Sequence, residues 1–574
     1  MRISISKSKN AEQIYIIKSF RDKNGKSTST IYRKLGSMAD LLPQFDNDRE
    51  KVMKWAREKA KQCTEEEKSG ILPVTLELSQ SRLVGHDRRI FNAGYIFLQD
   101  TLYDLDISSM CRKISSKRSF DFPLADILSD LVCARILQPC SKRSSYEYAS
   151  SLLEKPSYQL HDVYRSLDVL NDSMDMIQEH LYRKSSTLTE RNSRILFYDC
   201  TNYYFEIEEE DDFRKYGKAK QHKPNPIVQM GLFMDGNGIP LAFSVFPGNE
   251  SEQPSMAPLE KKIIRDFGLS KIVVCTDAGL ASTANRRLNN IGDRSFIVTQ
   301  SLKKLNNKLK DWALSPEGWH LSGSDSEVDI SEINEEEALK SDLVYFKEKW
   351  IKENGLEQRL IVSYSVKYKN YQRSIRSRQV ERAAKKAEKN ASRTHSNPNS
   401  PDRFLKEINT TKAGEVAQEK TVVLDGDRIR EEERYDGFYG VCTTLEDPVS
   451  DIIDISRRRW EIEESFRIMK TEFEARPVYL SREKRIKAHF LTCFIALLVY
   501  RILERKIDCR FSVGKIIEAL ASMKMMEVKG FGYLPSFNRT EVTDAIHESF
   551  GYRLDTEIIS HKNMKKIIKS SKNR

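Results

Sequence analysis

The chain has 574 residues, of which 39% are hydrophobic, a composition that supports about two to four domains and in which disorder does not dominate. Lysine and arginine outnumber aspartate and glutamate by 95 to 84, and the formal charge of +11 favours polyanionic partners without demonstrating nucleic-acid binding. The longest apolar run, residues 490–500, is about half as long as a bilayer-spanning helix, so we expect a buried helix and no membrane anchor.

The N-terminal residues show no apolar segment followed by a small-residue cleavage site, so we expect no secretion signal. The nine cysteines are scattered singly, without a Cys-x-x-Cys pair or a neighbouring histidine that would indicate a zinc site. These features predict reduced, mostly buried thiols in a cytoplasmic protein.

The first 190 residues are expected to form a short β element and then helices. Residues 13–35 predict a hairpin because two strand-like runs flank the turn-forming stretch RDKNGK, and a charged helix follows at 47–68. We therefore expect an N-terminal hairpin and helix over 1–75 and a helical region over 76–190. Three successive helices in this region favour either a helix-turn-helix that binds a DNA end or a simple packing unit.

Residues 191–300 change to a strand-rich pattern typical of an α/β layer. The predicted strands lie at 194–199, 226–235, 239–246, 271–277 and 295–300, and the predicted helices at 253–267 and 281–291.

The regular pattern weakens over 301–436, and we interpret this segment as an insertion between two parts of one core. It contains a strand-like run at 360–366 and a basic stretch at 373–393. Core character returns over 437–510, with a charged helix predicted at 449–473 and an apolar helix after it. The basic region 511–574 ends in a tail with six cations and no acid, which either frays in solvent or follows phosphates.

The charged helix has a stripe in which one acid lies among cations. At about 100° per residue, the side chains that share this stripe with Ser456 are Arg459, Glu463, Arg467 and Lys470. Trp460 is expected to pack against the core. An ordinary ion pair between Arg459 and Glu463, worth a few tenths of a kcal/mol, explains part of this pattern without any functional site.

Two further carboxylates end strand-like runs, Asp199 after 194–198 and Asp277 after 271–276. A carboxylate at the edge of a buried strand loses solvation unless a partner compensates it, and a divalent cation often does. With Glu463, these residues predict a site for two Mg²⁺ or Mn²⁺ ions and an in-line phosphoryl displacement. The phosphodiester backbone would be held by Arg459, Lys470 and Arg467.

Five blocks in this order resemble those of a DDE transposase from a bacterial or archaeal insertion sequence. The blocks are LFYDCTNYYFE, GLFMDGNGIPLAFSVFPGNESE, IVVCTDAGLASTANRRL, YDGFYGVCTT and RWEIEESFRIMK, and they cover roughly 190–300 and 436–506. Arg459, Glu463 and Lys470 match the spacing of the family's Tyr-x2-Arg-x3-Glu-x6-Lys signature. Ser456 replaces its tyrosine, which removes an aromatic contact expected beside the DNA.

The resemblance implies an α/β RNase H-like catalytic core, a mixed sheet with flanking helices, which is interrupted by a largely β insertion and preceded by a mainly helical N-terminal region. It implies a metal-binding, catalytic triad of Asp199, Asp277 and Glu463, with Arg459 and Lys470 contacting DNA. The implied reaction cuts the inverted-repeat ends of an insertion sequence and joins the freed 3′-OH ends to target DNA. The implied partners are double-stranded DNA and a second copy of the chain, with the protein associated with the nucleoid.

Three other interpretations remain open. A catalytically decayed or domesticated relative would bind DNA without cutting it, and an RNase H-like nuclease would cut without strand transfer. In a basic α/β protein without a site, the carboxylates would only cap loops and helices. The resemblance also implies an aromatic residue of the insertion on which a flipped base can stack, and the available tryptophans are Trp312, Trp319 and Trp350.

Overall fold

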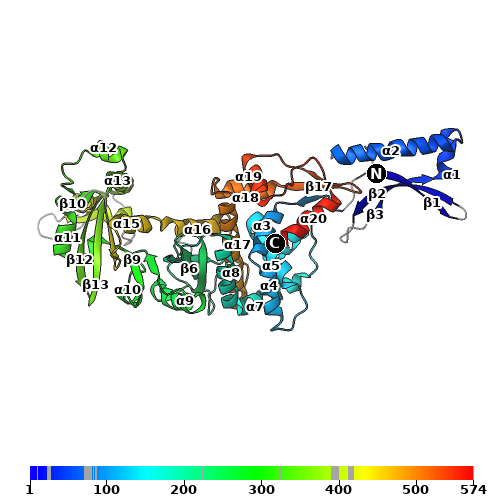
Figure 1. Cartoon of the computed structure of the whole chain (residues 1–574). Helices are drawn as coiled ribbons and strands as arrows, with labels where there is room; N and C mark the ends of the chain where they lie inside the picture. Colours follow the sequence, from blue (N-terminus) through cyan, green and yellow to red (C-terminus); the bar gives the residue numbers. More distant parts are fainter. Residues whose placement is uncertain are drawn as a thin grey trace. The chain divides into compact units, whose positions relative to one another are not determined.

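The computed structural model describes residues 1–572 except 9–10, 22–26, 70–79, 82, 84–86, 221–223, 322–325, 390–399 and 411–418. The chain divides into two compact units. The smaller unit comprises Met1–Arg89, Glu527–Leu534 and Asp555–Lys562, and the larger comprises Ile90–Met526, Pro535–Leu554 and Asn563–Arg574. Figure 1 shows the elements of both units coloured along the sequence.

The smaller unit contains a three-stranded antiparallel sheet in the order β1-β2-β3. Its elements are β1 (Arg2–Ser8), β2 (Ala11–Arg21), β3 (Ser27–Ser37), α1 (Met38–Leu41) and α2 (Arg49–Ser69). Ile14 on β2 and Val52 on α2 are fully buried in one cluster, which packs the helix on the sheet. The expected hairpin lies in β2 and β3, with most of its turn outside the described residues, and the sequence pattern did not predict β1.

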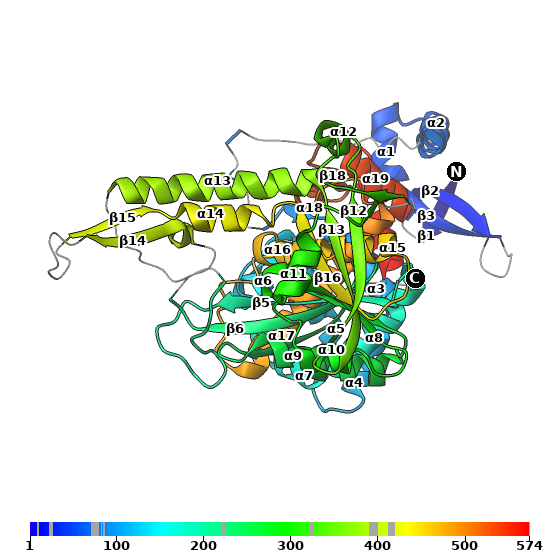
Figure 2. The same cartoon turned by 90° about the vertical axis from the view of Figure 1, so that its left-hand side faces the viewer.

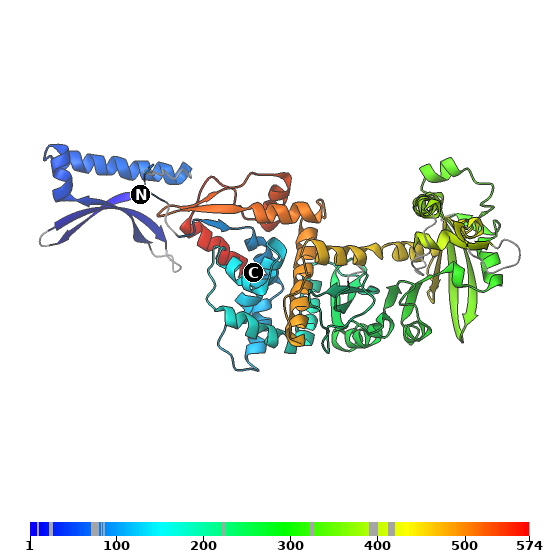
Figure 3. The same cartoon turned by 180° about the vertical axis from the view of Figure 1, so that it is seen from behind.

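The larger unit begins with helices that pack around one long apolar helix. These elements are α3 (Tyr95–Asp104), α4 (Ile107–Ser115), α5 (Leu124–Leu137), α6 (Lys142–Ala149), α7 (Leu160–Asp172), α8 (Met174–Leu188) and, much later in the chain, α17 (Glu483–Lys506). α17 contacts α5 and α7 as well as β7 (Pro240–Pro247), so it lies between these helices and the large sheet (Figure 3). α5 and α7 therefore belong to the core of this unit.

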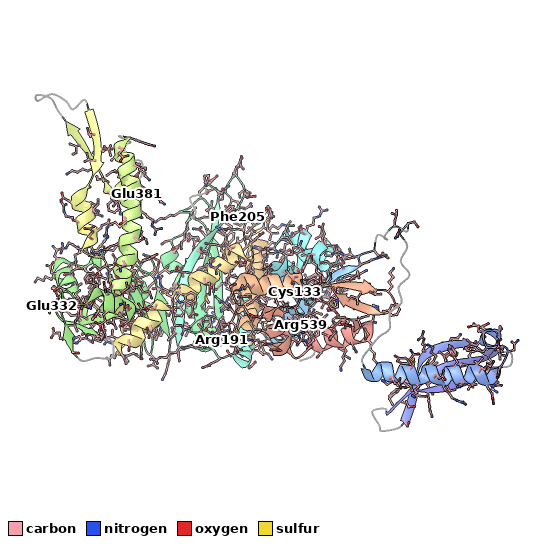
Figure 4. The ribbon with its side chains drawn as sticks, turned by 90° about the horizontal axis from the view of Figure 1, so that it is seen from above. Cys133, Arg191, Phe205, Glu332, Glu381 and Arg539 are labelled. Carbon is pink, nitrogen blue, oxygen red and sulfur yellow. The ribbon has the colours of Figure 1, made fainter. Side chains whose placement is uncertain are left out.

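α17 is long and apolar enough to cross a membrane by length and composition, but 94% of its most apolar window is buried inside the protein. This burial is that of a core helix, as the sequence predicts. The nine cysteines are free thiols and seven of them are buried, among them Cys133 of α5 (Figure 4).

A ten-stranded mixed sheet forms the centre of the larger unit, in the order β11-β10-β12-β13-β16-β9-β8-β5-β6-β7. β5 pairs parallel with β8 and β8 with β9, whereas the other neighbours whose register is known are antiparallel. The strands of its part outside the insertion are β5 (Ile195–Tyr204), β6 (Ile227–Asp235), β7, β8 (Val273–Thr276), β9 (Ser295–Gln300) and β16 (Phe438–Thr443). With α9 (Glu252–Phe267) and α10 (Thr283–Leu288) after β7 and β8, this mixed sheet fits an RNase H-like core.

The segment 301–436 is a mixture of helices and strands, so the expectation of a largely β insertion is wrong. Its main elements are α11 (Asn307–Leu314), β10 (Trp319–Leu321), β11 (Glu327–Val328), α12 (Glu335–Lys340), β12 (Tyr345–Glu353), β13 (Leu356–Tyr364), α13 (Val366–Glu388), β14 (Leu405–Thr410), β15 (Glu419–Leu424) and α14 (Gly426–Glu433). The basic stretch forms α13 because its arginine, lysine, glutamine, glutamate and alanine residues favour helix.

The hairpin of β12 and β13 extends the large sheet, because β13 pairs with β16. α13 continues beyond the sheet and packs against β15 (Figure 2). Ala383 of α13 and Val422 of β15 are buried in a small separate hydrophobic cluster there. The insertion is therefore part sheet extension and part helical arm, on which Figure 4 labels Glu381.

The predicted helix 449–473 is two helices, α15 (Val449–Arg457) and α16 (Trp460–Thr471). Arg458 and Arg459 join them with helical backbone angles, and the amide of Arg459 donates to Ser456 O, three residues back. Such a tight turn changes the hydrogen-bond pattern without reversing the chain direction. The chain therefore runs on in the same direction through the break, and Glu463 lies on α16.

Candidate active site

Asp199 and Asp277 lie on adjacent parallel strands. β5 and β8 pair in a register that sets Ile195 opposite Val273 and Phe197 opposite Cys275. Continuing this register by two residues sets Asp199 opposite Asp277, which directly follows β8. Residues opposite each other on adjacent strands point to the same face, so the two carboxylates share one face of the sheet.

The sequence predicts that Asp199 ends a strand. In the structure it lies instead in the middle of β5. β5 continues to Tyr204 because β6 pairs with it over this whole length, whereas β8 ends at Thr276. The carboxylate therefore lies where β5 loses its neighbour on one side.

The surroundings of Asp199 oppose its ionisation. Burial raises the pKa of its carboxyl to about 6, with the Lys220 ammonium lowering it and the Asp277 carboxylate raising it further. The backbone amide of Cys200 donates to Asp199 Oδ1 at 2.7 Å, and that of Leu280 donates to Asp277 Oδ1 at 3.0 Å. These two amide contacts are those expected if the carboxylates only cap the following residues. Capping does not explain why Asp199 and Asp277 face each other.

Glu463 lies on α16, and its side chain is 59% exposed. Arg459 Nη2 is 3.5 Å from Glu463 Oε1, so the expected ion pair is present. Although burial opposes the charge of Arg459, its pKa is raised by surrounding groups that include Glu463 and Asp277. Its charge also lowers the pKa of Asp199. Arg459 therefore lies within electrostatic reach of all three carboxylates.

The other members of the stripe separate in the structure. Lys470 Nζ donates to Thr201 Oγ1 on β5 and lies 5.5 Å from the centre of the Tyr203 ring. Because Thr201 is two residues from Asp199, α16 crosses the face of β5 that carries the candidate site. Arg467 instead is 53% exposed and pairs with acids of its own segment, Glu464 at 3.4 Å and Glu472 at 3.8 Å.

A cavity of about 620 Å³ opens beside Glu463, and Ser456 lies in its wall. Its aromatic lining comes from α13, β16 and the start of α16, namely Tyr368, Tyr371, Tyr439 and Trp460. Trp460 is 56% exposed, so the prediction that it packs in the core is wrong. The helix break at Arg458 and Arg459 places Trp460 at the first position of α16, on the cavity side.

The three tryptophans of the insertion do not line this cavity. Trp319 is fully buried, and its Nε1 donates to Ser315 O at 2.9 Å. Trp312 packs partly buried against the same cluster, whereas Trp350 on β12 is 47% exposed. Burial of Trp319 makes it a core residue and not a stacking surface.

Sequence reasoning missed Lys220, which the structure brings beside Asp199. Lys220 lies in the irregular segment between β5 and β6, and its Nζ donates to Cys200 O and lies 3.3 Å from Glu252 Oε1. No periodic pattern marks this segment, so no signal in a single sequence could have found the contact. Only the folding of the segment back onto β5 creates it.

The donor set suits Mg²⁺ or Mn²⁺, because these ions prefer carboxylate oxygens and Asp199 and Asp277 present them side by side. The pKa of Asp199 is raised in part by the facing Asp277 carboxylate. A divalent cation bound between the two carboxylates would offset their repulsion. Among the residues that the structure describes, no group of three His, Cys, Asp or Glu side chains is close enough to hold an ion. Glu463 would have to turn from Arg459 to join the pair.

The family model described as the transposase DDE domain matches residues 191–499, more than half of the chain. No curated protein matches. Among solved structures, the chain is similar to the piggyBac transposase synaptic complex with hairpin DNA, with 7% identity, a TM-score of 0.36 and coverage of 84% of each chain. It is also similar to the Mos1 transposase paired-end complex with left transposon end, with 11% identity, a TM-score of 0.13 and coverage of 40% of this chain and 64% of that chain. The family match, which spans β5, β8 and α16 alike, shows that the chain belongs to the DDE transposase domain family.

Proposed function

We propose that this protein is a DNA transposase that cuts the inverted-repeat ends of an insertion sequence and joins their 3′-OH ends to target DNA. The observation that carries the proposal is the pairing of β5 with β8, which sets Asp199 opposite Asp277 under the helix of Glu463. Its expected partners are double-stranded DNA at the element ends and at the target, and a second copy of the chain in the DNA complex. It would work in the cytoplasm, bound to the nucleoid.

Asp199, Asp277 and Glu463 are the residues that would hold two Mg²⁺ or Mn²⁺ ions. When bound, such ions activate the attacking oxygen and stabilise the leaving oxygen of a phosphoryl transfer. Arg459 lies close enough to the carboxylates to bind the phosphate that reacts, and Lys470 binds the backbone beside it. Arg467, on the exposed side of α16, would contact DNA farther from the reacting phosphate.

The alternatives differ in what they do to DNA. A decayed relative would bind the terminal repeat and leave it intact, whereas an RNase H-like nuclease would cut it without joining. The presence of all three carboxylates in one part of the fold favours an active enzyme over the decayed relative. The family match favours a transposase over a nuclease.

The test is cleavage and strand transfer on labelled DNA that carries the terminal inverted repeat, with Mg²⁺ or Mn²⁺. We expect the wild type to cut and join, and Asp199→Ala, Asp277→Asn and Glu463→Gln to lose both activities while still binding the repeat. Glu461→Gln is the matched control, because Glu461 is on α16 too but pairs with Arg458 at 2.8 Å. Binding without cutting by the wild type would support the decayed relative, and cutting without joining the nuclease.

A further inference from the structure

Three cations from three separate segments converge on the part of β5 that lies beyond Asp199. Lys220 comes from the segment between β5 and β6, Lys470 from the last turn of α16, and Arg476 from the segment that follows α16. Lys220 reaches Cys200 O, Lys470 reaches Thr201 Oγ1, and the Arg476 guanidinium lies 5.5 Å from the centre of the Tyr204 ring. Figure 4 labels Phe205, the residue that directly follows β5.

The position of Lys220 is built into the fold. Asn202, a buried residue of β5, donates from Nδ2 to Lys218 O at 3.2 Å, and its Oδ1 accepts from the Lys220 amide at 3.4 Å. These two contacts tie the main chain of the segment to β5. The Lys220 side chain is therefore directed toward Asp199 by a buried amide and not by chance contact on the surface.

Lys470 is repelled by the other two cations, whereas Lys220 is stabilised by Asp199 and Glu252. Burial lowers the pKa of Lys470 to about 8, and the charges of Arg476 and Lys220 lower it further, whereas Asp199 raises it. Arg476 Nη1 is buried without a hydrogen-bond partner among the described atoms. The nearby acids are Asp199 and Glu252, and the proposed function commits Asp199 to metal ions. With Asp199 committed to metal ions, Glu252 is left to balance the three cations.

We propose that Lys220, Lys470 and Arg476 form a binding site for consecutive backbone phosphates of the DNA strand that is cut, next to the reacting phosphate and along β5 toward Tyr204. The stretch from Cys200 to Tyr204 is about 13 Å long at about 3.3 Å per residue, which is enough for more than one phosphate. Lys220, Lys470 and Arg476 bind the phosphates, and Asn202 is a positioning residue for Lys220. This inference rests on the proposed function for the identity of the strand.

The first experiment measures binding of the full chain to terminal-repeat DNA in Ca²⁺ as a function of salt concentration. Each lost phosphate contact reduces the magnitude of the negative slope of log K against log salt by about 0.9. We expect this loss for Lys220→Gln and for Arg476→Gln, an intermediate loss for Asn202→Ala, and full retention in Lys220→Arg. Lys271→Gln is the matched control. Lys271 is 79% exposed and precedes the start of β8, whereas Asp277 follows its other end.

The second experiment uses repeat DNA with a single neutral methylphosphonate at successive positions beside the cut. We expect one position that weakens wild-type binding about 10-fold and leaves Lys220→Gln unaffected, which would identify the phosphate that Lys220 binds. Thermal unfolding of each variant checks that the fold is retained. Wild-type slope in both Lys220→Gln and Arg476→Gln, with no position coupled to Lys220, would overturn the site.

The two proposals fail in different ways. If the wild type binds the repeat without cutting it but the salt slope is smaller in magnitude in Lys220→Gln, the phosphate site stands and the enzymatic function does not. If the wild type cuts and joins DNA while all variants keep the wild-type slope and rate, the function stands and the phosphate site does not.

Discussion

The two ends of α16 are held in different ways. Near its C-terminal end, Lys470 donates to Thr201, and Met469 is fully buried where the Tyr203 hydroxyl donates to its sulfur at 3.9 Å. Near its N-terminal end, Glu463 and Trp460 are both more than half exposed and line the cavity. The buried end fixes the helix on β5, and the exposed end keeps its acid accessible to a ligand.

This difference separates stability from chemistry along a single helix. Burial of apolar area stabilises the fold, whereas an exposed ion pair contributes at most about 1 kcal/mol. Substitutions at the N-terminal end should therefore change activity with little effect on folding. Substitution of the buried Met469 at the C-terminal end should instead lower stability.

The largest expected effect is that of Glu463→Gln on catalysis. We expect the rate of metal-dependent cleavage to fall by about 10³-fold or more, because the amide cannot replace a charged metal ligand. The free energy of unfolding should change by less than about 0.5 kcal/mol, since only an exposed ion pair is lost. Single-turnover cleavage and urea unfolding measure the two effects. A stability loss as large as that of a core substitution would contradict the claim that the N-terminal end of α16 contributes little to stability.

Met469→Ala should show the opposite behaviour. Removing this buried side chain leaves a cavity between α16 and β5, which should lower the free energy of unfolding by about 2–5 kcal/mol. Met526→Ala is the matched control, because Met526 is 40% exposed and should cost much less. Urea unfolding of both variants gives the answer, and equal losses would contradict the packing described for α16.

Asp199→Asn sharpens the comparison through its pH dependence. Because the folded carboxyl has a pKa of about 6, above its ordinary value of 3.8, the folded state binds more protons than the unfolded state between these values. The stability contributed by this group is therefore present at low pH and lost as the pH rises through 6. At pH 7.5 in EDTA, Asp199→Asn should be more stable than the wild type by at most about 3 kcal/mol.

The advantage of Asp199→Asn should shrink at pH 5 and also when Mg²⁺ stabilises the wild type. Urea unfolding at the two pH values, with and without Mg²⁺, measures both changes. An advantage that is the same under all these conditions would show that the carboxyl is not strained by burial and by Asp277.

The smallest expected effect is that of Trp460→Ala on stability. Because this side chain is more than half exposed, its removal should change the free energy of unfolding by less than about 0.5 kcal/mol. Trp319→Ala, at a fully buried tryptophan, should cost about 3–5 kcal/mol in the same urea experiment. Similar losses for the two variants would mean that Trp460 is buried in solution, and the cavity beside Glu463 would then be closed.

The sequence predicted the larger elements because their patterns are local. The strand of Asp277, the apolar helix α17 and the charged segment of Glu463 all follow from hydrophobic periodicity. The split of the predicted helix into α15 and α16 was missed, because no glycine or proline marks it. The character of the insertion was also missed, since β13 joins the large sheet by pairing with β16, a strand about 80 residues later in the chain.

The sequence by itself determined which residue types are available and roughly where the strands and helices run, because both depend on neighbours along the chain. Only the tertiary structure decided which of the charges meet. The parallel register of β5 and β8 sets Asp199 opposite Asp277, the packing of α16 on β5 brings Lys470 to Thr201, and a buried amide directs Lys220 to the same place. These contacts join residues far apart in sequence, and their energy comes from burial that no local pattern records.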